Sequence, residues 1–219
     1  MSAPSRTADP HDGRTLEDVV PAPPAPAALE PGDPTILGLP IFAAGSIALG
    51  LQLLGVVSDA GVGAPLAIIF AGTGLGLLLS TIWAARIGQT MVAGVFGLFC
   101  GFWLSYAALV LGLTHNWFAV PTADVADTQL IFQVTWAAVF GTLTLASVRL
   151  PSSFTAVFGL VTLALLLLIV GNLATETFPV RLAGVVSLVF AAIGLYLFLA
   201  AASAASGGRA WGIGSPLAH

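Results

Sequence analysis

The chain has 219 residues, of which 58% are hydrophobic and 7% are charged, and its formal net charge is −4. Soluble domains carry about 25% charged residues, so this composition argues against a soluble globular protein. It favours a protein whose surface faces lipid over much of its area. The single cysteine, Cys100, cannot form an intramolecular disulfide and lies inside an apolar run.

Residues 1–32 form a tail rich in proline, alanine and acidic residues. The proline-rich run at 21–26 cannot form a regular helix, because proline lacks a backbone N–H and its ring fixes φ. We expect this tail to be disordered and cytoplasmic, and it lacks the apolar central segment of a signal peptide. An alternative is that the tail is a docking segment for a cytosolic partner.

Six apolar runs follow, each close to the roughly 20 residues that a helix needs to cross a bilayer. None contains Asp, Glu, Arg or His, so we expect every charged residue to lie in a connection or a tail. The sequence therefore predicts an all-α integral membrane protein, with a six-helix transport domain at 33–204 and a short cytoplasmic tail at 205–219. The runs lie at residues 37–57, 64–84, 91–113, 129–148, 154–174 and 182–203.

The basic residues predict how the chain is oriented in the membrane. All six are arginines, and six crossings place only Arg181 on one side. Because Lys and Arg are retained on the cytoplasmic side, we expect both termini in the cytoplasm and the protein in the cell (inner or plasma) membrane. The cytoplasmic side then holds Arg6, Arg14, Arg86, Arg149 and Arg209.

The runs lack the side chains that most membrane enzymes and pumps need. All three histidines lie outside the runs, whereas a membrane haem protein usually binds its iron through histidines within the spans. The Ser/His pair or paired aspartates of an intramembrane hydrolase are missing from the runs, and so is a titratable proton relay. We therefore expect no enzyme, no cofactor, no metal site and no nucleic-acid partner.

Aromatic side chains are the main candidates for functional groups within the runs. Phe99, Phe102, Trp103 and Tyr106 follow the spacing i, i+3, i+4, i+7 and so share one face of the third helix. This face either packs against neighbouring helices or lipid, or it narrows a conduit. Aromatic edges carry partial positive charge, so they tolerate an anion better than ring faces do. Asn172, whose amide both donates and accepts, is a candidate for a pore vestibule.

Several stretches occur in an order and at a spacing that carry a family resemblance. Residues 33–39, Asp-Pro-Thr-Ile-Leu-Gly-Leu, are similar to the signature N-P-x-P-[LF]-G-L, with Asp33 in place of Asn and Ile36 in place of the second Pro. Residues 100–104, Cys-Gly-Phe-Trp-Leu, look like the stretch G-S-F-W-L. Trp136 with residues 140–143, Gly171 with Asn172, and residues 184–196 are similar to the last three spans of the same family. Together they resemble the acetate uptake transporter family, the small acetate and succinate permeases of bacteria and fungi.

The resemblance implies a six-helix protomer that assembles into a homo-hexamer, with one conduit through each protomer. It also implies small monocarboxylates such as acetate, sometimes succinate, as substrates. The family's gate has one residue on each of three helices, and these positions correspond to Phe42, Phe99 and Val161, where the family commonly has Tyr second and Leu third. Gly194 falls at a position that influences the size of the solute. Further residues expected to line the pathway are Asp33, Gly38, Leu39, Phe102, Trp103, Trp136 and Asn172.

The function predicted from these features is a channel or proton-coupled permease for small monocarboxylates. Without a titratable relay in the runs, a coupled proton would travel on the solute as the neutral acid. Two alternatives stay open, a channel for a neutral solute such as urea or a short amide, and a membrane interaction protein that transports nothing. Asp33 is expected either to cap the first helix beside Pro34 or to discourage anions at the mouth.

Overall fold

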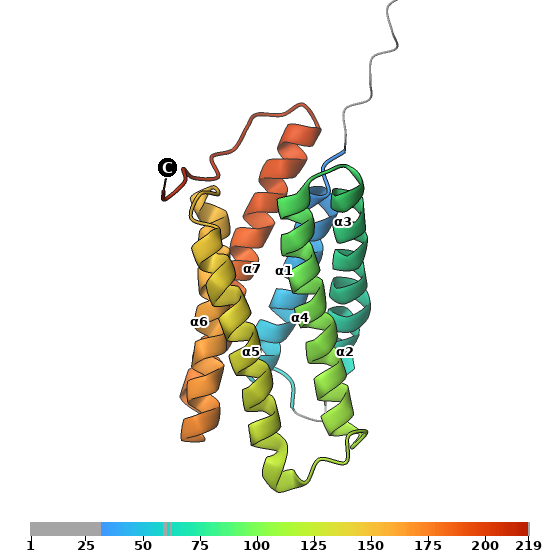
Figure 1. The fold of residues 1–219 in the computed structure, drawn as a ribbon, viewed down its shortest axis with the longest axis vertical. Helices are drawn as coiled ribbons and strands as arrows, with labels where there is room; N and C mark the ends of the chain where they lie inside the picture. The colour runs from blue at the N-terminus through green and yellow to red at the C-terminus, as the bar shows by residue number, and fades with distance from the viewer. Residues whose placement is uncertain (1–31, 59–60, 62, 219) are drawn as a thin grey trace, which may run out of the picture. The chain divides into compact units, whose positions relative to one another are not determined.

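A computed structural model describes residues 32–58, 61 and 63–218 of the chain (Figure 1). All of them belong to one compact unit. Of the tail at 1–32, predicted to be disordered, residues 1–31 lie outside the described residues. The helices are α1 (Thr35–Leu53), α2 (Gly63–Ala67), η3 (Ile68–Gly74), α3 (Leu75–Arg86), α4 (Thr90–Thr114), η4 (Thr122–Asp124), α5 (Val125–Ala146), α6 (Ser152–Ala174) and α7 (Thr177–Ala205).

Among the described residues, six helical segments are long and apolar enough to span a membrane, which confirms the all-α, six-helix prediction. We call these segments crossings. Short connections make successive crossings run up and down, as Figure 1 shows. In the bundle, α1 packs along α7, α7 along α6, α6 along α5, and α3 along α4. The first and last crossings are therefore neighbours, and a conduit among α1, α4, α6 and α7 becomes possible.

Close approach of α1 and α7 depends on two glycines that face each other. A Cβ atom built on Gly50 would lie 3.0 Å from the carbonyl oxygen of Gly184, and one built on Gly184 would lie 2.9 Å from that of Gly50. Any larger residue would push the two backbones apart. Small residues at such crossings are the usual way for membrane helices to pack tightly, because van der Waals contact must replace the hydrophobic effect.

The helices extend beyond most of the apolar runs, so one expectation from the sequence is wrong. Arg86 closes α3, Asp127 lies in the first turn of α5 and Arg181 lies within α7, whereas the sequence predicts all charged residues outside the spans. Backbone hydrogen bonding continues past the hydrocarbon core into the polar layer of a bilayer, so helix ends can carry charge. The first helix is instead shorter than predicted, because Gly55 at φ +77° follows its end at Leu53.

The second crossing is not a regular α-helix. Its middle, η3, is a π-helix, and α2 and α3 continue it on either side. The buried Thr73 hydroxyl in this segment donates to the carbonyl oxygen of Ile41 in α1 at 3.1 Å. Because π-turns project side chains differently from α-turns, this crossing presents Thr73 to α1 next to Phe42.

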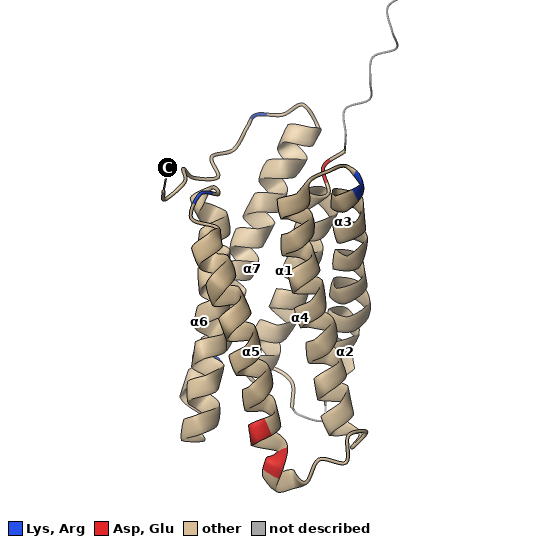
Figure 2. Cartoon of the chain, viewed as in Figure 1, with Lys and Arg blue, Asp and Glu red and all other residues tan. Residues whose placement is uncertain are grey.

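Charged residues gather at the two ends of the described bundle (Figure 2). We call these the Asp33 end, where α1 and α4 begin, and the Asn172 end, where α4 and α6 finish. Besides Asp33, the first end carries Arg86, Arg149 and Arg209, whereas Asp124, Asp127 and Glu176 lie at the second. The apolar middle is the part that a bilayer would cover.

Candidate conduit through the helix bundle

A cavity of about 190 Å³ lies inside the bundle in the half nearer the Asp33 end, and we call it the central cavity. Four crossings form its wall, namely α1, α4, α6 and α7, together with the connection before α6. Its volume is well above that of one water molecule, so a solute of a few heavy atoms fits inside it. Its lining residues are Thr35, Leu39, Phe42, Met91, Val92, Val95, Phe96, Phe99, Leu150, Pro151, Phe154, Val157, Phe158, Gly194 and Leu197.

The central cavity is closed on its inner side by a pair of aromatic rings. The ring centroids of Phe42 and Phe99 are 4.7 Å apart and the ring planes meet at 61°, which is an edge-to-face arrangement. Phe99 also lies 6.1 Å from the Phe158 ring and 4.7 Å from the Phe140 ring, and Phe190 lies 5.8 Å from Phe42. Each ring of the pair is thus held by other aromatic side chains from α5, α6 or α7.

A second, smaller cavity lies beyond this pair and also has Phe42 and Phe99 in its wall. Its volume of about 20 Å³ is just enough for one water molecule. Val161 lines this inner cavity together with Phe102 and Trp103, but it does not line the central one. The structure therefore brings the three predicted gate residues together, with Phe42 and Phe99 between the two cavities and Val161 on the inner side.

Two glycines leave room for aromatic rings at these walls. A Cβ atom on Gly194 would lie 3.1 and 3.3 Å from two ring carbons of Phe42, so Gly194 sets how far that ring can lean toward α7. A Cβ atom on Gly38 would collide with the ring of Phe96. Of these two predicted pathway residues, Gly194 lines the central cavity directly, and Gly38 acts through Phe96.

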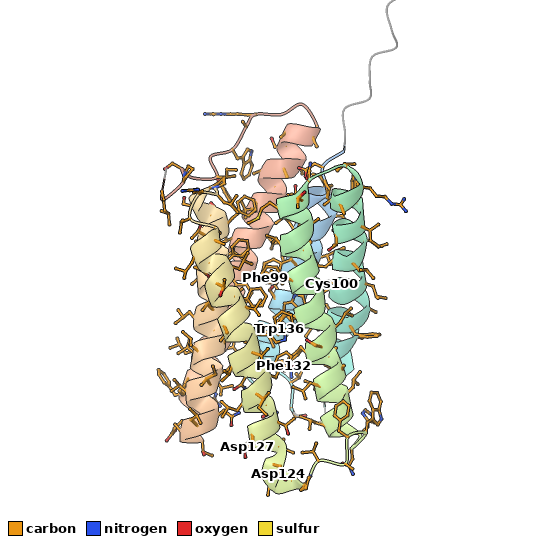
Figure 3. All side chains as sticks on the ribbon, viewed as in Figure 1. Phe99, Cys100, Asp124, Asp127, Phe132 and Trp136 are labelled. Carbon is orange, nitrogen blue, oxygen red and sulfur yellow. The ribbon has the colours of Figure 1, made fainter. Side chains whose placement is uncertain are left out.

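The predicted aromatic face of α4 packs mainly against α5. Phe102 contacts Trp136 and Phe140 edge-to-face, with ring centroids 5.5 and 5.6 Å apart. Figure 3 shows Trp136 and Phe132 between the ribbons of α4 and α5, below Phe99. Trp136 lies against Gly101 and is outside both cavities, so its role here is to support the wall that Phe102 and Trp103 form.

Two buried polar atoms lack a hydrogen-bond partner in the described part of the chain, and one of them belongs to Trp103, which lines the inner cavity. One is the indole Nε1 of Trp103, a residue only 1% exposed. The other is Oε1 of Gln52, whose side chain lies beside Tyr106, one turn beyond Trp103. Buried polar groups almost always have partners, so these two atoms are exceptions within the described part of the chain.

Asp33 stands at the mouth of the bundle and binds its own chain. Its carboxylate accepts from the Thr35 backbone N–H at 2.8 Å and from the Thr35 hydroxyl at 2.6 Å. The first of these bonds is the one that an N-cap residue makes. Thr35 and Leu39, one turn apart on α1, then continue from Asp33 into the central cavity.

Asn172 lies far from this mouth, where it joins two helices. Its Nδ2 atom donates to the Ala126 carbonyl oxygen at 2.9 Å and to Oε1 of Gln133 at 3.4 Å, both on α5. The amide lies outside both cavities and bridges α6 to α5 at the Asn172 end.

Some aromatic residues that line the candidate conduit were not predicted from the sequence. Phe154 and Phe158 lie at i and i+4 on α6, and both line the central cavity. That spacing is visible in the sequence and marks one helix face. By contrast, no spacing indicates that Phe190 of α7 meets Phe42, because the contact joins opposite ends of the chain.

The lining of both cavities is uncharged among the residues that the structure describes. In the same residues, no three His, Cys, Asp or Glu side chains gather as metal ligands would. The walls of this arrangement consist mainly of aromatic and aliphatic side chains. Such a path suits a small solute that needs little stabilisation of charge.

Comparisons with known proteins agree with this architecture. The sequence model of the GPR1/FUN34/yaaH family matches residues 17–208. A solved structure described as that of the bacterial acetate channel SatP is similar to this chain, with a TM-score of 0.73 and 23% sequence identity, over 84% of this chain and 99% of that one. Among curated proteins, none matches the chain.

Proposed function

Because this chain belongs to the GPR1/FUN34/yaaH family, we propose that it is a membrane channel or permease for small monocarboxylates such as acetate. The family match confirms the resemblance that the sequence motifs predict. One observation carries the proposal, namely that two uncharged cavities inside one protomer meet at the Phe42–Phe99 pair. The similarity in fold to an acetate channel supports acetate as the first solute to test.

The aromatic pair is the main barrier on this path. A carboxylate in an apolar environment loses its hydration, which is very costly for a bare anion. The edge-to-face geometry of Phe42 and Phe99 presents ring hydrogens as well as ring faces, and ring edges carry partial positive charge. A carboxylate that passes along these edges is repelled less than by two parallel faces.

The uncharged walls also bear on how a proton would move. Neither cavity is lined by Asp, Glu or His among the described residues, so the walls offer no proton relay. A proton coupled to transport therefore travels on the solute, which crosses the aromatic pair as the neutral acid. This route avoids the desolvation of a charge.

Trp103, which lines the inner cavity, and Gln52 each carry a buried polar atom without a protein partner in the described residues. The indole N–H of Trp103 has no protein partner and can donate to a carboxyl oxygen. Gln52 Oε1, also without a partner, can accept from the hydroxyl of a neutral acid. A solute that reached both groups would pair with them better as the neutral acid than as the anion, which has acceptors only.

The surroundings of the conduit belong to the same proposal. We place the protein in the cell membrane as a multi-pass chain with its Asp33 end in the cytoplasm, since Arg86, Arg149 and Arg209 lie at that end. Many large apolar side chains outside the cavities are exposed, for example Leu79, Ile131 and Leu145, and lipid or neighbouring subunits of a homo-hexamer would cover them. Succinate is a second candidate substrate.

The same donor and acceptor also favour a second function. An amide such as urea both donates and accepts, so it too would pair with Trp103 and Gln52. The uncharged lining does not oppose a neutral solute. A urea or short-amide channel is therefore the competing hypothesis.

Uptake by proteoliposomes separates the two functions. Labelled acetate and labelled urea are each offered at neutral pH, with protein-free liposomes as the control for diffusion through the lipid. The proposal expects acetate uptake above the control, saturation with acetate, and little competition by urea. Urea uptake without acetate uptake would instead establish the competing function, and a repeat with an imposed pH gradient at fixed voltage tests whether a proton moves with acetate.

A further inference from the structure

The segment that follows α7 turns back over the Asp33 end of the bundle (Figure 1). We call residues 207–218 the strap. It leaves α7 at Gly207, where φ is +74°, and reaches the α5–α6 connection, where Pro216 pairs with Pro151 as an isolated β-bridge. The strap therefore crosses from the last helix to the beginning of α6.

Hydrogen bonds fix the strap along its length. Gly212 and Ile213 offer carbonyl oxygens to the Tyr196 hydroxyl at 2.6 Å and to the Ser153 hydroxyl at 2.7 Å. Farther along, the backbone N–H groups of Leu217 and Ala218 donate to the Val148 carbonyl oxygen at 2.9 and 3.1 Å. These bonds join the strap to α7, to α6 and to the connection between α5 and α6.

Ring packing and one glycine complete this attachment. The rings of Trp211 and Tyr196 lie 5.5 Å apart. Gly214 has φ +86°, and a Cβ atom there would collide with Ser152. The strap can pass this close to α6 only because position 214 has no side chain.

A third cavity, the vestibule, lies beneath the strap and has a volume of about 290 Å³. Ala210, Trp211 and Ile213 of the strap form part of its wall, and Asp33, which precedes α1, and Thr35 of α1 belong to the same lining. The vestibule shares four lining residues with the central cavity, so the two spaces adjoin. These shared residues are Thr35, Leu39, Phe154 and Leu197.

We propose that the strap forms the outer wall of the conduit's entrance, and that Trp211 and Ile213 limit which solutes pass from the vestibule into the central cavity. The inference rests on the proposed transport function and extends it to a segment outside the six crossings. In this arrangement a solute reaches the Phe42–Phe99 pair by way of the vestibule.

A cysteine placed in the vestibule reports on the strap directly. Ala201 of α7 lines the vestibule but not the central cavity, so Ala201→Cys places a thiol there with a small change in volume. The native Cys100 is buried, and the parent protein measures its background reaction. The rate of modification by a bulky, charged thiol reagent is followed in the full-length protein in proteoliposomes.

A matched pair of glycine variants then tests whether the strap is the wall. Asn tolerates positive φ, so Gly214→Asn and Gly207→Asn keep the backbone conformation, but only Gly214→Asn brings a side chain against Ser152. We expect Gly214→Asn to speed modification of Ala201→Cys roughly tenfold through local detachment, and Gly207→Asn to leave the rate near that of the parent. Tyr196→Phe removes the hydrogen bond from the Tyr196 hydroxyl to the Gly212 carbonyl oxygen and should leave the protein folded. We expect it to raise the modification rate, but by less than Gly214→Asn does.

Transport supplies the second readout. Modification of Ala201→Cys should reduce acetate uptake several-fold, because the bulky adduct fills the vestibule. Equal modification rates in Gly214→Asn and Gly207→Asn would contradict the proposal that the strap forms the outer wall of the vestibule. Unchanged uptake after full modification would contradict the proposal that the vestibule is the entrance of the conduit. If the unmodified parent takes up no acetate, the proposed function itself fails, while the modification rates still report on the strap.

Discussion

At the scale of single residues, the width of the conduit depends on how the Phe42 ring is placed. Phe99 of α4 and Phe190 of α7 contact this ring, and Gly194 of α7 leaves space beside two of its carbon atoms. The position of the Phe42 ring therefore depends on the space that Gly194 leaves as well as on the rings that contact it. Residues that press on Phe42 should change transport without touching the solute.

The first prediction concerns Gly194→Ala. Its Cβ atom would lie 3.1 Å from a Phe42 ring carbon, tighter than ordinary contact, so the ring must shift by a few tenths of an ångström toward the path. We expect acetate uptake to fall several-fold, and uptake of longer monocarboxylates to fall more. Gly94→Ala in α4 is the matched control, because a Cβ atom there meets nothing within 4 Å. Equal uptake by both variants would contradict this role for Gly194.

The second prediction concerns the indole N–H of Trp103. Trp103→Phe keeps an aromatic ring and removes a buried donor that has no protein partner. We expect half-saturation by acetate to need roughly three- to tenfold more solute, because a net hydrogen bond contributes about 0.5–1.5 kcal/mol. Trp136→Phe, whose ring lies outside both cavities, should leave half-saturation unchanged.

A structural role for Trp103 would give a different result. Loss of the unpartnered N–H relieves a desolvation cost, whereas the smaller Phe ring leaves a cavity, so the two effects oppose each other and we expect only a modest net change in the melting temperature. A large loss of thermal stability with unaltered half-saturation would show that Trp103 only packs the wall.

At the scale of the elements, the second crossing shows where sequence reasoning stops. The run at 64–84 predicts a membrane helix, and the structure confirms one, but the π-helical middle has no signal in the apolar pattern. Whether a turn becomes α or π depends on contacts with neighbours, here Thr73 against Ile41 and Gly45. The six crossings follow from hydropathy alone, because the length of an apolar run and the thickness of a bilayer determine them.

The third prediction tests the contact between η3 and α1. Thr73→Val replaces the hydroxyl by a methyl group and removes the bond to the Ile41 carbonyl oxygen, so we expect a loss of about 1 kcal/mol of stability. Thermal unfolding in detergent measures it. Thr81→Val is the control, since the Thr81 hydroxyl donates to Leu77 within its own helix. A melting temperature lowered equally in both variants would show that the interhelical bond adds nothing.

The candidate site was predictable in part, and particular residues show why. Phe42, Phe99 and Val161 were placed by family motifs, and the structure brings them around two adjoining cavities. Phe190, Gln52 and the strap were not predicted, because their roles come from contacts between segments far apart in the sequence. Trp136 and Asn172 match the motifs but pack between α4, α5 and α6. A motif identifies a position, and only the packing determines which way it faces.

At the scale of the whole molecule, a single chain contains its own candidate path. The vestibule, the central cavity and the inner cavity adjoin in that order, from the Asp33 end toward the middle of the bundle. Of the described residues that line them, only Asp33 carries a charge, and it stands at the outer end. Under the proposed function, selection inside the membrane depends on size, ring edges and hydrogen bonds, and the described bundle forms these cavities within one chain.

The most direct test of this account is to locate a carboxylate inside the protein. Bromoacetate resembles acetate, and its bromine gives an anomalous X-ray signal that marks its position in a crystal. The account predicts a bromine peak within a protomer, in the central cavity beside Phe42 and Phe99, which unlabelled acetate displaces. Bromine peaks found only between protomers or on the lipid-facing surface, at concentrations that saturate uptake, would contradict a conduit through the helix bundle.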